Sequence, residues 1–228
     1  MGRSMLKIVK NIVGLYLLAA AGLVLAQVES TEQQPVTAHS VVRAATMEVM
    51  AVVQAADEYV EDEPERYYGE VQAVLDGVVD FRGFARSVMG PYASSERYRA
   101  LDESGRAELK IQLDEFTEVM RIGLIRTYSK GLLAFGGSRI EVSSASGDEA
   151  GQTRTSVQQL IFSEQTKPYV VMYQMGLDRA GQWKLRNMII ESVNLGEIYR
   201  NQFEASARKF EGDLNQVIVS WNAEALDT

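Results

Sequence analysis

The chain has 228 residues, of which 46% are hydrophobic and 24% are charged, with four prolines and no cysteine. This composition is typical of a globular protein with a sizeable core, and it excludes a disordered chain and a scaffold held together by disulfides. The formal net charge of −8, with no Lys/Arg run after residue 10, argues against nucleic-acid binding by charge.

Residues 1–26 have the features of a secretory signal peptide. Three cations precede an apolar run that ends at the small residue Ala26. The run is shorter than the ~20 residues that a bilayer span needs, so cleavage is preferred over an uncleaved anchor. No lipid-attachment cysteine follows the run. We therefore expect a soluble periplasmic protein, not lipid-anchored, in which residues 27–228 form one domain. Loss of the three cations and no acid would change the formal charge from −8 to −11.

Two helices are predicted between residues 35 and 79. Apolar residues recur every three or four positions along residues 35–60, which indicates a long amphipathic helix. Pro64 suits the first turn of a second helix, which is expected to end near Val79. The acidic stretch Glu61–Glu63 lies between them. A metal site is its alternative interpretation, but no histidine or further acid completes a ligand set, so we expect a solvated junction and no metal.

A compact helix and a long helix are predicted next. The compact helix begins near Asp80 and is closed by Gly90-Pro91. Asp102 or Ser104 caps the long helix, which carries one apolar stripe. Such a stripe either packs in a core or lines a cavity, and the residues alone leave both open. The stripe consists of Leu109, Leu113, Phe116, Met120, Leu124 and Tyr128.

Four strands with short connections are predicted after Gly136-Gly137, which indicates an antiparallel meander and an α+β fold. They cover residues 139–143, residues 153–162 after a polar turn at 146–149, and two long strands within 167–190 joined by a turn at Asp178–Gly181. The sheet part is expected at about residues 138–192, and the helical part at about 36–135 and 195–225.

The first of the two long strands is apolar on both faces, because Tyr169, Val171 and Tyr173 alternate with Val170 and Met172. Both faces of an apolar sheet have to be shielded from water. Packed helices can shield one face. If nothing fills the other side, the fold contains an apolar cavity, which is the usual character of a small-molecule site.

Several short motifs follow one another in order along the chain. They are Asp80-Phe81, Val88-Met89-Gly90-Pro91-Tyr92, Glu103-Ser104-Gly105-Arg106 leading into Phe116 and Tyr128, Pro168 through Tyr173, Trp183-Lys184, Met188-Ile189-Ile190-Glu191, Val193 and Tyr199-Arg200-Asn201-Gln202-Phe203. Over roughly residues 40–225 this series resembles the MlaC-type periplasmic phospholipid carriers, also called the toluene-tolerance auxiliary family.

Two segments depart from the pattern of that family. The family usually has Trp-Lys-Val-Tyr-Asp-Val where this chain has residues 183–188, so Asn187 replaces an acid. It has Ile-Glu-Gly-Val-Ser where this chain has residues 190–194, so Ser192 replaces a glycine and Asn194 a serine. The departures concern a turn and the polarity of the pocket mouth.

The resemblance implies a curved antiparallel four-stranded sheet, a cone of the nuclear-transport-factor type, packed with a helical subdomain. It further implies that the protein is not an enzyme and needs no cofactor, but holds the acyl chains of a phospholipid and leaves the head group outside. The implied partners are an inner-membrane ABC transporter with an MCE-domain ring and an outer-membrane lipoprotein–porin complex. Shuttling between these complexes would maintain outer-membrane lipid asymmetry.

We expect the acyl chains to contact apolar side chains from the two later helices and the strands. These are Phe81, Phe84, Val88, Tyr92, Phe116, Met120, Leu124, Tyr128, Val157, Val171, Tyr173, Met175, Trp183, Leu185 and Met188. Tyr199 and Arg200 are expected at the pocket mouth. Core packing is the alternative for each apolar residue, and a solvated helix face is the alternative for Arg200.

Two other classes of function stay open. One is a cone-fold enzyme that uses Glu191 as a lone acid/base on an apolar substrate. Glu191 is flanked by Ile189 and Ile190, but a structural role as a hydrogen-bond acceptor is preferred. The only histidine, His39, lies far up the chain, and nucleophile or phosphate-binding motifs are lacking. The other class is a structural adaptor whose apolar sheet is covered by another protein.

Overall fold

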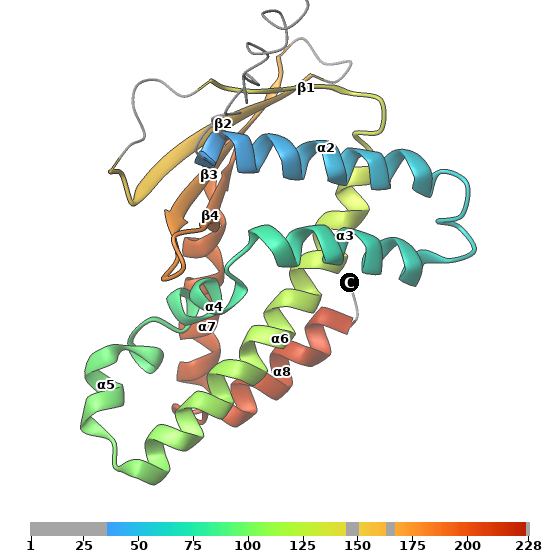
Figure 1. Cartoon of the computed structure of the whole chain (residues 1–228). Coiled ribbons are helices and arrows are strands. Elements are labelled where there is room, and N and C mark those ends of the chain that lie inside the picture. The colour runs from blue at the N-terminus through green and yellow to red at the C-terminus, as the bar shows by residue number, and fades with distance from the viewer. Residues whose placement is uncertain (1–35, 145–150, 163–166, 227–228) are drawn as a thin grey trace, which may run out of the picture. The chain divides into compact units, whose positions relative to one another are not determined.

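The computed structural model describes residues 36–144, 151–162 and 167–226. The predicted signal peptide and the polar turn predicted at 146–149 lie outside these residues. The described residues form an α+β fold in which a helical part is joined to an open antiparallel sheet (Figure 1). None of the helices in these ranges combines the length and the apolar character that crossing a membrane requires.

Helices precede and follow the sheet in the chain. Their bounds are α2 Ala38–Ala56, α3 Pro64–Val78, α4 Phe81–Met89, the 3₁₀ turn η1 Gly90–Ala93, α5 Ser95–Ala100, α6 Glu103–Leu133, α7 Leu195–Lys209 and α8 Leu214–Leu226. Asp102, one of the two predicted caps, begins α6 by accepting a hydrogen bond from the Gly105 N–H at 2.8 Å. The short helix α5 was not expected from the sequence.

The C-terminal region forms two helices, where the sequence suggested a single return to helix. Glu211 and Gly212 have φ of 52° and 86°, and the Gly212 N–H donates to the Ala207 carbonyl at 2.8 Å. This left-handed ending closes α7 and reverses the chain. Asp213 then accepts from the Gln216 N–H at 3.1 Å and starts α8. The reversal lets α8 pack along α6 (Figure 1).

The sheet has five strands, not four. They are β1 Arg139–Val142, β2 Arg154–Phe162, β3 Tyr169–Leu177, β4 Trp183–Ile190 and β5 Val193–Asn194, paired antiparallel in chain order. The extra strand exists because Glu191 and Ser192 form a two-residue hairpin turn, with φ of 48° and 70° and the pair Ile190–Val193 next to them. Both φ values lie in the left-handed region that such a turn requires.

Buried apolar residues gather in three separate clusters. The helical cluster joins α4, α6, α7 and α8 around Phe116 and Phe203. The sheet cluster packs the start of α2 against Val157 and Trp183. The third cluster packs α2 on α3 around Tyr67, whose hydroxyl donates to the Ser129 carbonyl of α6 at 2.8 Å. α2 runs across the sheet and thereby belongs to two of the three clusters (Figure 1).

Ser192→Gly is expected to stabilise the protein by about 0.5–1 kcal/mol. A residue with a Cβ costs about 1–2 kcal/mol in the left-handed region, and glycine avoids this cost. Part of the gain is offset because glycine loses more conformational entropy than serine on folding. Urea unfolding followed by circular dichroism measures the change. Gly181→Ser is the reciprocal control. Gly181 has φ of 76° in the β3–β4 turn and open space around its Cβ position, so this change should destabilise by a similar amount. An unchanged midpoint in Ser192→Gly would contradict the strain argument.

Candidate ligand-binding cavity

An apolar cavity of about 310 Å³ lies between the helices and the sheet. Each buried cluster supplies part of its wall: Phe84 comes from the helical cluster, Met175 from the sheet cluster and Val49 from the α2–α3 cluster. The volume is at the small end of the roughly 300–1,000 Å³ that is usual for ligand pockets. It is far more than a single water needs, and an apolar cavity of this kind stays dry or holds an apolar guest.

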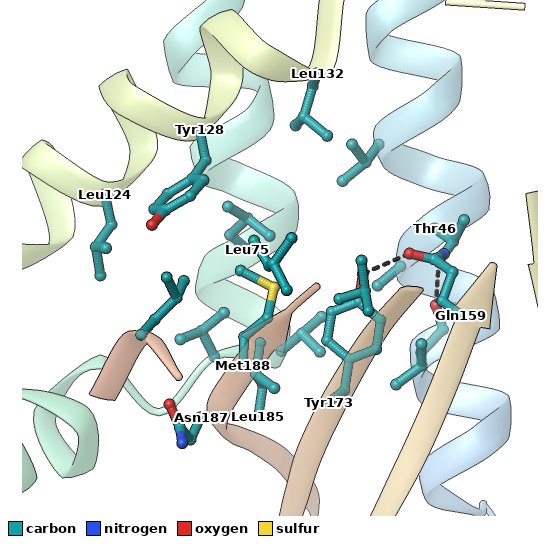
Figure 2. Close-up of a pocket in the computed structure, with 18 of the residues that line it drawn as sticks. Thr46, Leu75, Leu124, Tyr128, Leu132, Gln159, Tyr173, Leu185, Asn187 and Met188 are labelled. Carbon is teal, nitrogen blue, oxygen red and sulfur yellow. Dashed lines mark hydrogen bonds between the residues drawn. The ribbon is translucent and has the colours of Figure 1, made fainter. Parts of the chain in front are cut away.

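The period-two pattern of the strands aims one face of the sheet into the cavity. Tyr173 pairs with Val157 on β2 and with Met188 on β4, and Val171 pairs with Gln159 and Ile190, so these side chains share a face. Between the pairs Gln174–Asn187 and Met175–Leu185 the register shifts by one residue, so Arg186 has no register partner on β3 and forms a bulge in β4. Figure 2 shows Tyr173, Leu185 and Met188 rising from the strands beneath the helices.

Nine of the fifteen apolar residues predicted to contact a ligand line this cavity. They are Phe81, Phe84, Leu124, Tyr128, Val171, Tyr173, Met175, Leu185 and Met188. They come from α4, from the second half of α6, and from β3 and β4. The structure thus brings together residues that are up to about a hundred positions apart in the chain.

The other six are core residues outside the cavity lining. Val88, Tyr92, Phe116 and Met120 belong to or pack on the helical cluster, and Val157 and Trp183 pack under the start of α2. The α6 residues divide between core and cavity because this helix is 31 residues long. At 1.5 Å per residue it spans about 46 Å, so one stripe passes from a solid core at Phe116 to the open space at Leu124.

The predicted mouth residues lie outside the cavity lining too. The Arg200 guanidinium donates to the Ser87 carbonyl at 3.0 Å and to the Ser87 hydroxyl at 2.9 Å, so it joins α7 to α4. Tyr199 stands edge-on to the ring of Phe84 and hydrogen-bonds Tyr128, which does line the cavity. Burial, and secondly the phenol of Tyr199, raise the pKa of Tyr128, which therefore stays neutral at physiological pH.

Sequence reasoning missed the contribution of the first two helices to the wall. Val42, Ala45, Thr46, Val49 and Met50 of α2 line the cavity, and Leu75, Val78 and Val79 do so from α3 and the residue after it. The three- and four-residue spacing of α2 was the available signal. It identified a buried face without saying whether that face met side chains or empty space.

A chain of hydrogen bonds crosses one side of the cavity wall. The Tyr173 hydroxyl donates to Gln159 Oε1 at 2.5 Å, Gln159 Nε2 donates to Thr46 Oγ1 at 2.8 Å, and the Thr46 hydroxyl donates to the Val42 carbonyl at 2.8 Å. Figure 2 shows the two hydrogen bonds of Gln159 on the α2 side, with Leu124 and Tyr128 on the other side of the space. Burial raises the pKa of Tyr173, so its phenol remains a hydrogen-bond donor.

Arg186 is the one charged residue among the described residues that line the cavity. Its guanidinium pairs with Asp80 and donates to the Leu177 carbonyl at 3.2 Å, while its stem lies over Gly176. Asp80 also caps α4 by accepting from the Gly83 N–H at 2.9 Å. The positive charge is thus neutralised beside the helix start and does not project into the apolar space.

Asn187 organises the junction between the sheet and α7. Its amide nitrogen donates to Gln174 Oε1 at 3.0 Å and to Asn194 Oδ1 at 2.9 Å, and its Oδ1 accepts from the Gly196 N–H at 3.0 Å. Asn194 in turn caps α7 by accepting from the Glu197 N–H at 3.2 Å. Asn187 and Asn194, which both depart from the pattern of the resembled family, are therefore joined by one hydrogen bond.

Glu191 lies in the exposed β4–β5 turn and outside the cavity lining. Its carboxylate accepts a hydrogen bond from the Val170 N–H and so ties the turn to β3. This contact gives the residue the structural role that the sequence favoured. Across the described ranges, no three His, Cys, Asp or Glu side chains lie close enough together to hold a metal ion.

Comparison with known proteins gives three similarities. The family model described as MlaC protein matches residues 43–223. The toluene tolerance protein ttg2D of Pseudomonas putida is 28% identical over 188 residues, which cover 82% of this chain and 81% of that protein. The crystal structure of a phospholipid-binding protein from Ralstonia solanacearum, solved with a phospholipid, superposes with a TM-score of 0.68 at 18% identity, covering 84% of this chain and 99% of that one. The last similarity concerns the fold.

Asn187→Asp is expected to destabilise the protein by about 1–3 kcal/mol at neutral pH, because a carboxylate would face two oxygen acceptors without a hydrogen to donate. The same contacts raise the folded-state pKa of the new carboxyl, so the loss is present above that pKa and shrinks as pH falls through it. Urea unfolding at several pH values measures both effects.

Asn194→Ser should rescue this variant. A serine hydroxyl can donate to the carboxylate while its oxygen still accepts from the Glu197 N–H. The full double-mutant cycle, with Asn194→Ser alone as the control, should therefore give a favourable coupling energy. Strictly additive effects would show that the two side chains do not act as a pair.

Proposed function

The chain belongs to the MlaC family, and on that premise we propose that it is a periplasmic carrier that encloses the acyl chains of a phospholipid. The observation that carries the proposal is the apolar cavity between three solid clusters. Moving one chain of about 15 methylenes into water costs about 12 kcal/mol at ~0.8 kcal/mol each. A carrier that crosses an aqueous compartment therefore has to surround the chain, which a shallow groove does not do.

The nine predicted residues that line the cavity are the proposed acyl contacts, together with the lining residues of α2 and α3. Val88, Tyr92, Phe116, Met120, Val157 and Trp183 are proposed to hold the walls in place instead. Met50 and Met188 suit chains of varying length, because a thioether side chain repacks at little cost. Tyr128 and Tyr199 place two hydroxyls beside the apolar space, where the polar part of a lipid would lie.

The finer form of the fold is part of the proposal. A cone of the nuclear-transport-factor type is supported by the meander order of the strands and by the bulge at Arg186 in β4, since a bulge bends its strand and increases the local twist. Residues 27–228 are proposed as one lipid-binding domain behind a signal peptide of residues 1–26, with the helical and sheet parts at the bounds predicted from the sequence. Export of this domain gives the periplasmic location.

We assign the protein to binding and transport rather than to catalysis. Glu191, the acid proposed for an enzymatic alternative, is outside the cavity lining and bound to backbone. A lone base needs to reach its substrate within hydrogen-bond distance. Turnover of a ketosteroid or lipid-ester panel that disappears in Glu191→Gln would reverse this assignment.

The proposed partners are proteins in the two membranes: an inner-membrane ABC transporter with an MCE-domain ring and an outer-membrane lipoprotein–porin complex. The acidic charge supports this choice, since an anionic protein is repelled by anionic lipid surfaces. Lipid would then pass between the cavity and a docked complex, and the carrier would sustain outer-membrane lipid asymmetry.

The direct test is mass spectrometry of the lipid that co-purifies with the exported chain. We expect about one two-chained phospholipid per cavity. A well-folded protein that carries no lipid, even after incubation with phospholipid vesicles and removal of free lipid, would favour the adaptor class.

Met188→Trp should reduce bound phospholipid severalfold while leaving the folded state intact, because the larger ring takes up cavity volume that the acyl chains would occupy. Met188 is a better choice than Met175, which packs in the sheet cluster and would overfill a solid core. Met47→Trp is the matched control, since Met47 is 68% exposed on the outer side of α2. Lipid content is measured by mass spectrometry and folding by thermal denaturation. Equal lipid in both variants would remove Met188 from the binding site.

Flotation with anionic vesicles tests the proposed docking. The purified chain should stay with the soluble fraction at low salt, where charge repulsion is strongest. Vesicles of neutral lipid provide the control for charge. Tight flotation with anionic vesicles in the absence of any partner protein would contradict docking onto membrane proteins as the route of lipid exchange.

A further inference from the structure

Gln159 interrupts an otherwise apolar face of the sheet. Its neighbours on that face of β2 are Val157 and Ile161, and its partner across β3 is Val171. Only 3% of its surface is exposed, although it lines the cavity. An amide in such surroundings costs free energy unless it is hydrogen-bonded, and an aliphatic residue would have avoided that cost.

Two residues from other elements use part of the hydrogen-bonding capacity of the Gln159 amide. Tyr173 on β3 donates to its carbonyl oxygen and Thr46 on α2 accepts from its nitrogen. The Thr46 hydroxyl donates its hydrogen to the Val42 carbonyl, so toward Gln159 it can only accept. This fixes the direction of all three hydrogen bonds that link Tyr173, Gln159, Thr46 and Val42. A side-chain amide has two N–H donors and a phenol oxygen can also accept. One N–H of Gln159 and the acceptor capacity of the Tyr173 oxygen therefore remain available at the cavity wall.

We propose that Gln159 and Tyr173 form an internal polar subsite that binds one oxygen atom of the enclosed lipid and thereby fixes how deeply the chain enters. The inference rests on the proposed function as a phospholipid carrier. The oxygen is either an ester carbonyl of the glycerol backbone, which accepts from the Gln159 N–H, or a hydroxyl on an acyl chain, which can accept from Gln159 and donate to Tyr173.

A purely structural role makes a different prediction. The Thr46–Gln159 bond joins α2 to the sheet, so its loss lowers stability in either case. Only a ligand-binding role makes the amide discriminate between lipids that differ solely in their ester carbonyls or in one chain hydroxyl. The test therefore measures discrimination between lipids and not total binding alone.

The experiment loads the exported chain from equal mixtures of two phosphatidylethanolamines and measures the bound ratio by mass spectrometry. One mixture contrasts a diester with its diether, which lacks the ester carbonyls. The other contrasts a plain diester with one that carries a hydroxyl in the middle of one chain. In one of the two mixtures the lipid with the extra oxygen should be enriched about fivefold, which corresponds to one net hydrogen bond of about 1 kcal/mol.

Gln159→Met removes the amide at nearly constant length and should bring that ratio to about one, since its thioether sulfur is only a weak acceptor and donates nothing. Gln159→Leu, which also lacks the amide, serves as the second variant if Gln159→Met does not fold, and Tyr173→Phe tests the hydroxyl case, in which the phenol oxygen accepts from the lipid. Ile161→Met, two residues along the same face, is the matched control and should keep the enrichment.

The mixture that shows the enrichment identifies the source of the oxygen. Ratios near one in both mixtures for the unchanged protein would overturn the subsite. An enrichment that the folded Gln159 variant leaves intact would overturn it too. In either case the carrier proposal would stand. Failure of the unchanged protein to load any of the lipids would instead overturn the carrier proposal, and the subsite with it.

Discussion

The organisation of this protein depends on apolar side chains that face one space without filling it. Protein interiors are normally packed as densely as organic crystals, and a void deprives its lining of dispersion contacts. Here three clusters of buried residues, which include Phe116, Val157 and Tyr67, form separately. The cavity is the region where they meet. Residues of all three clusters line it.

The polar groups near the cavity keep this frame in one arrangement. Asn187 uses both ends of its amide to join β3, β4 and the start of α7, and Gln159 joins α2 to the sheet. Arg186 is neutralised by Asp80 at the start of α4. Each of these groups takes its partners from separate elements. A buried polar network with such partners specifies a geometry that apolar packing alone leaves loose.

The candidate site was predictable from the sequence where one periodicity decides which way a side chain points. In β3 the period of two groups Val171, Tyr173 and Met175 on one face, and all three line the cavity. In α6 the same logic failed, because a single stripe serves two environments: Phe116 is buried among the helices and Leu124 lines the cavity. Periodicity identifies the buried side of an element and carries no information about what lies opposite.

The sequence by itself determined the α+β class, the helix start at Pro64 and four of the strands, and it narrowed the cap of α6 to Asp102 or Ser104, because caps, breakers and apolar spacing act within a few residues. The ordered motifs also pointed to the family. Only the tertiary structure decided the rest. Whether an apolar face meets side chains or a cavity depends on the distance to another element, as does the pairing of Gln159 with Thr46, 113 positions apart in the chain. Local sequence patterns do not encode such long-range distances.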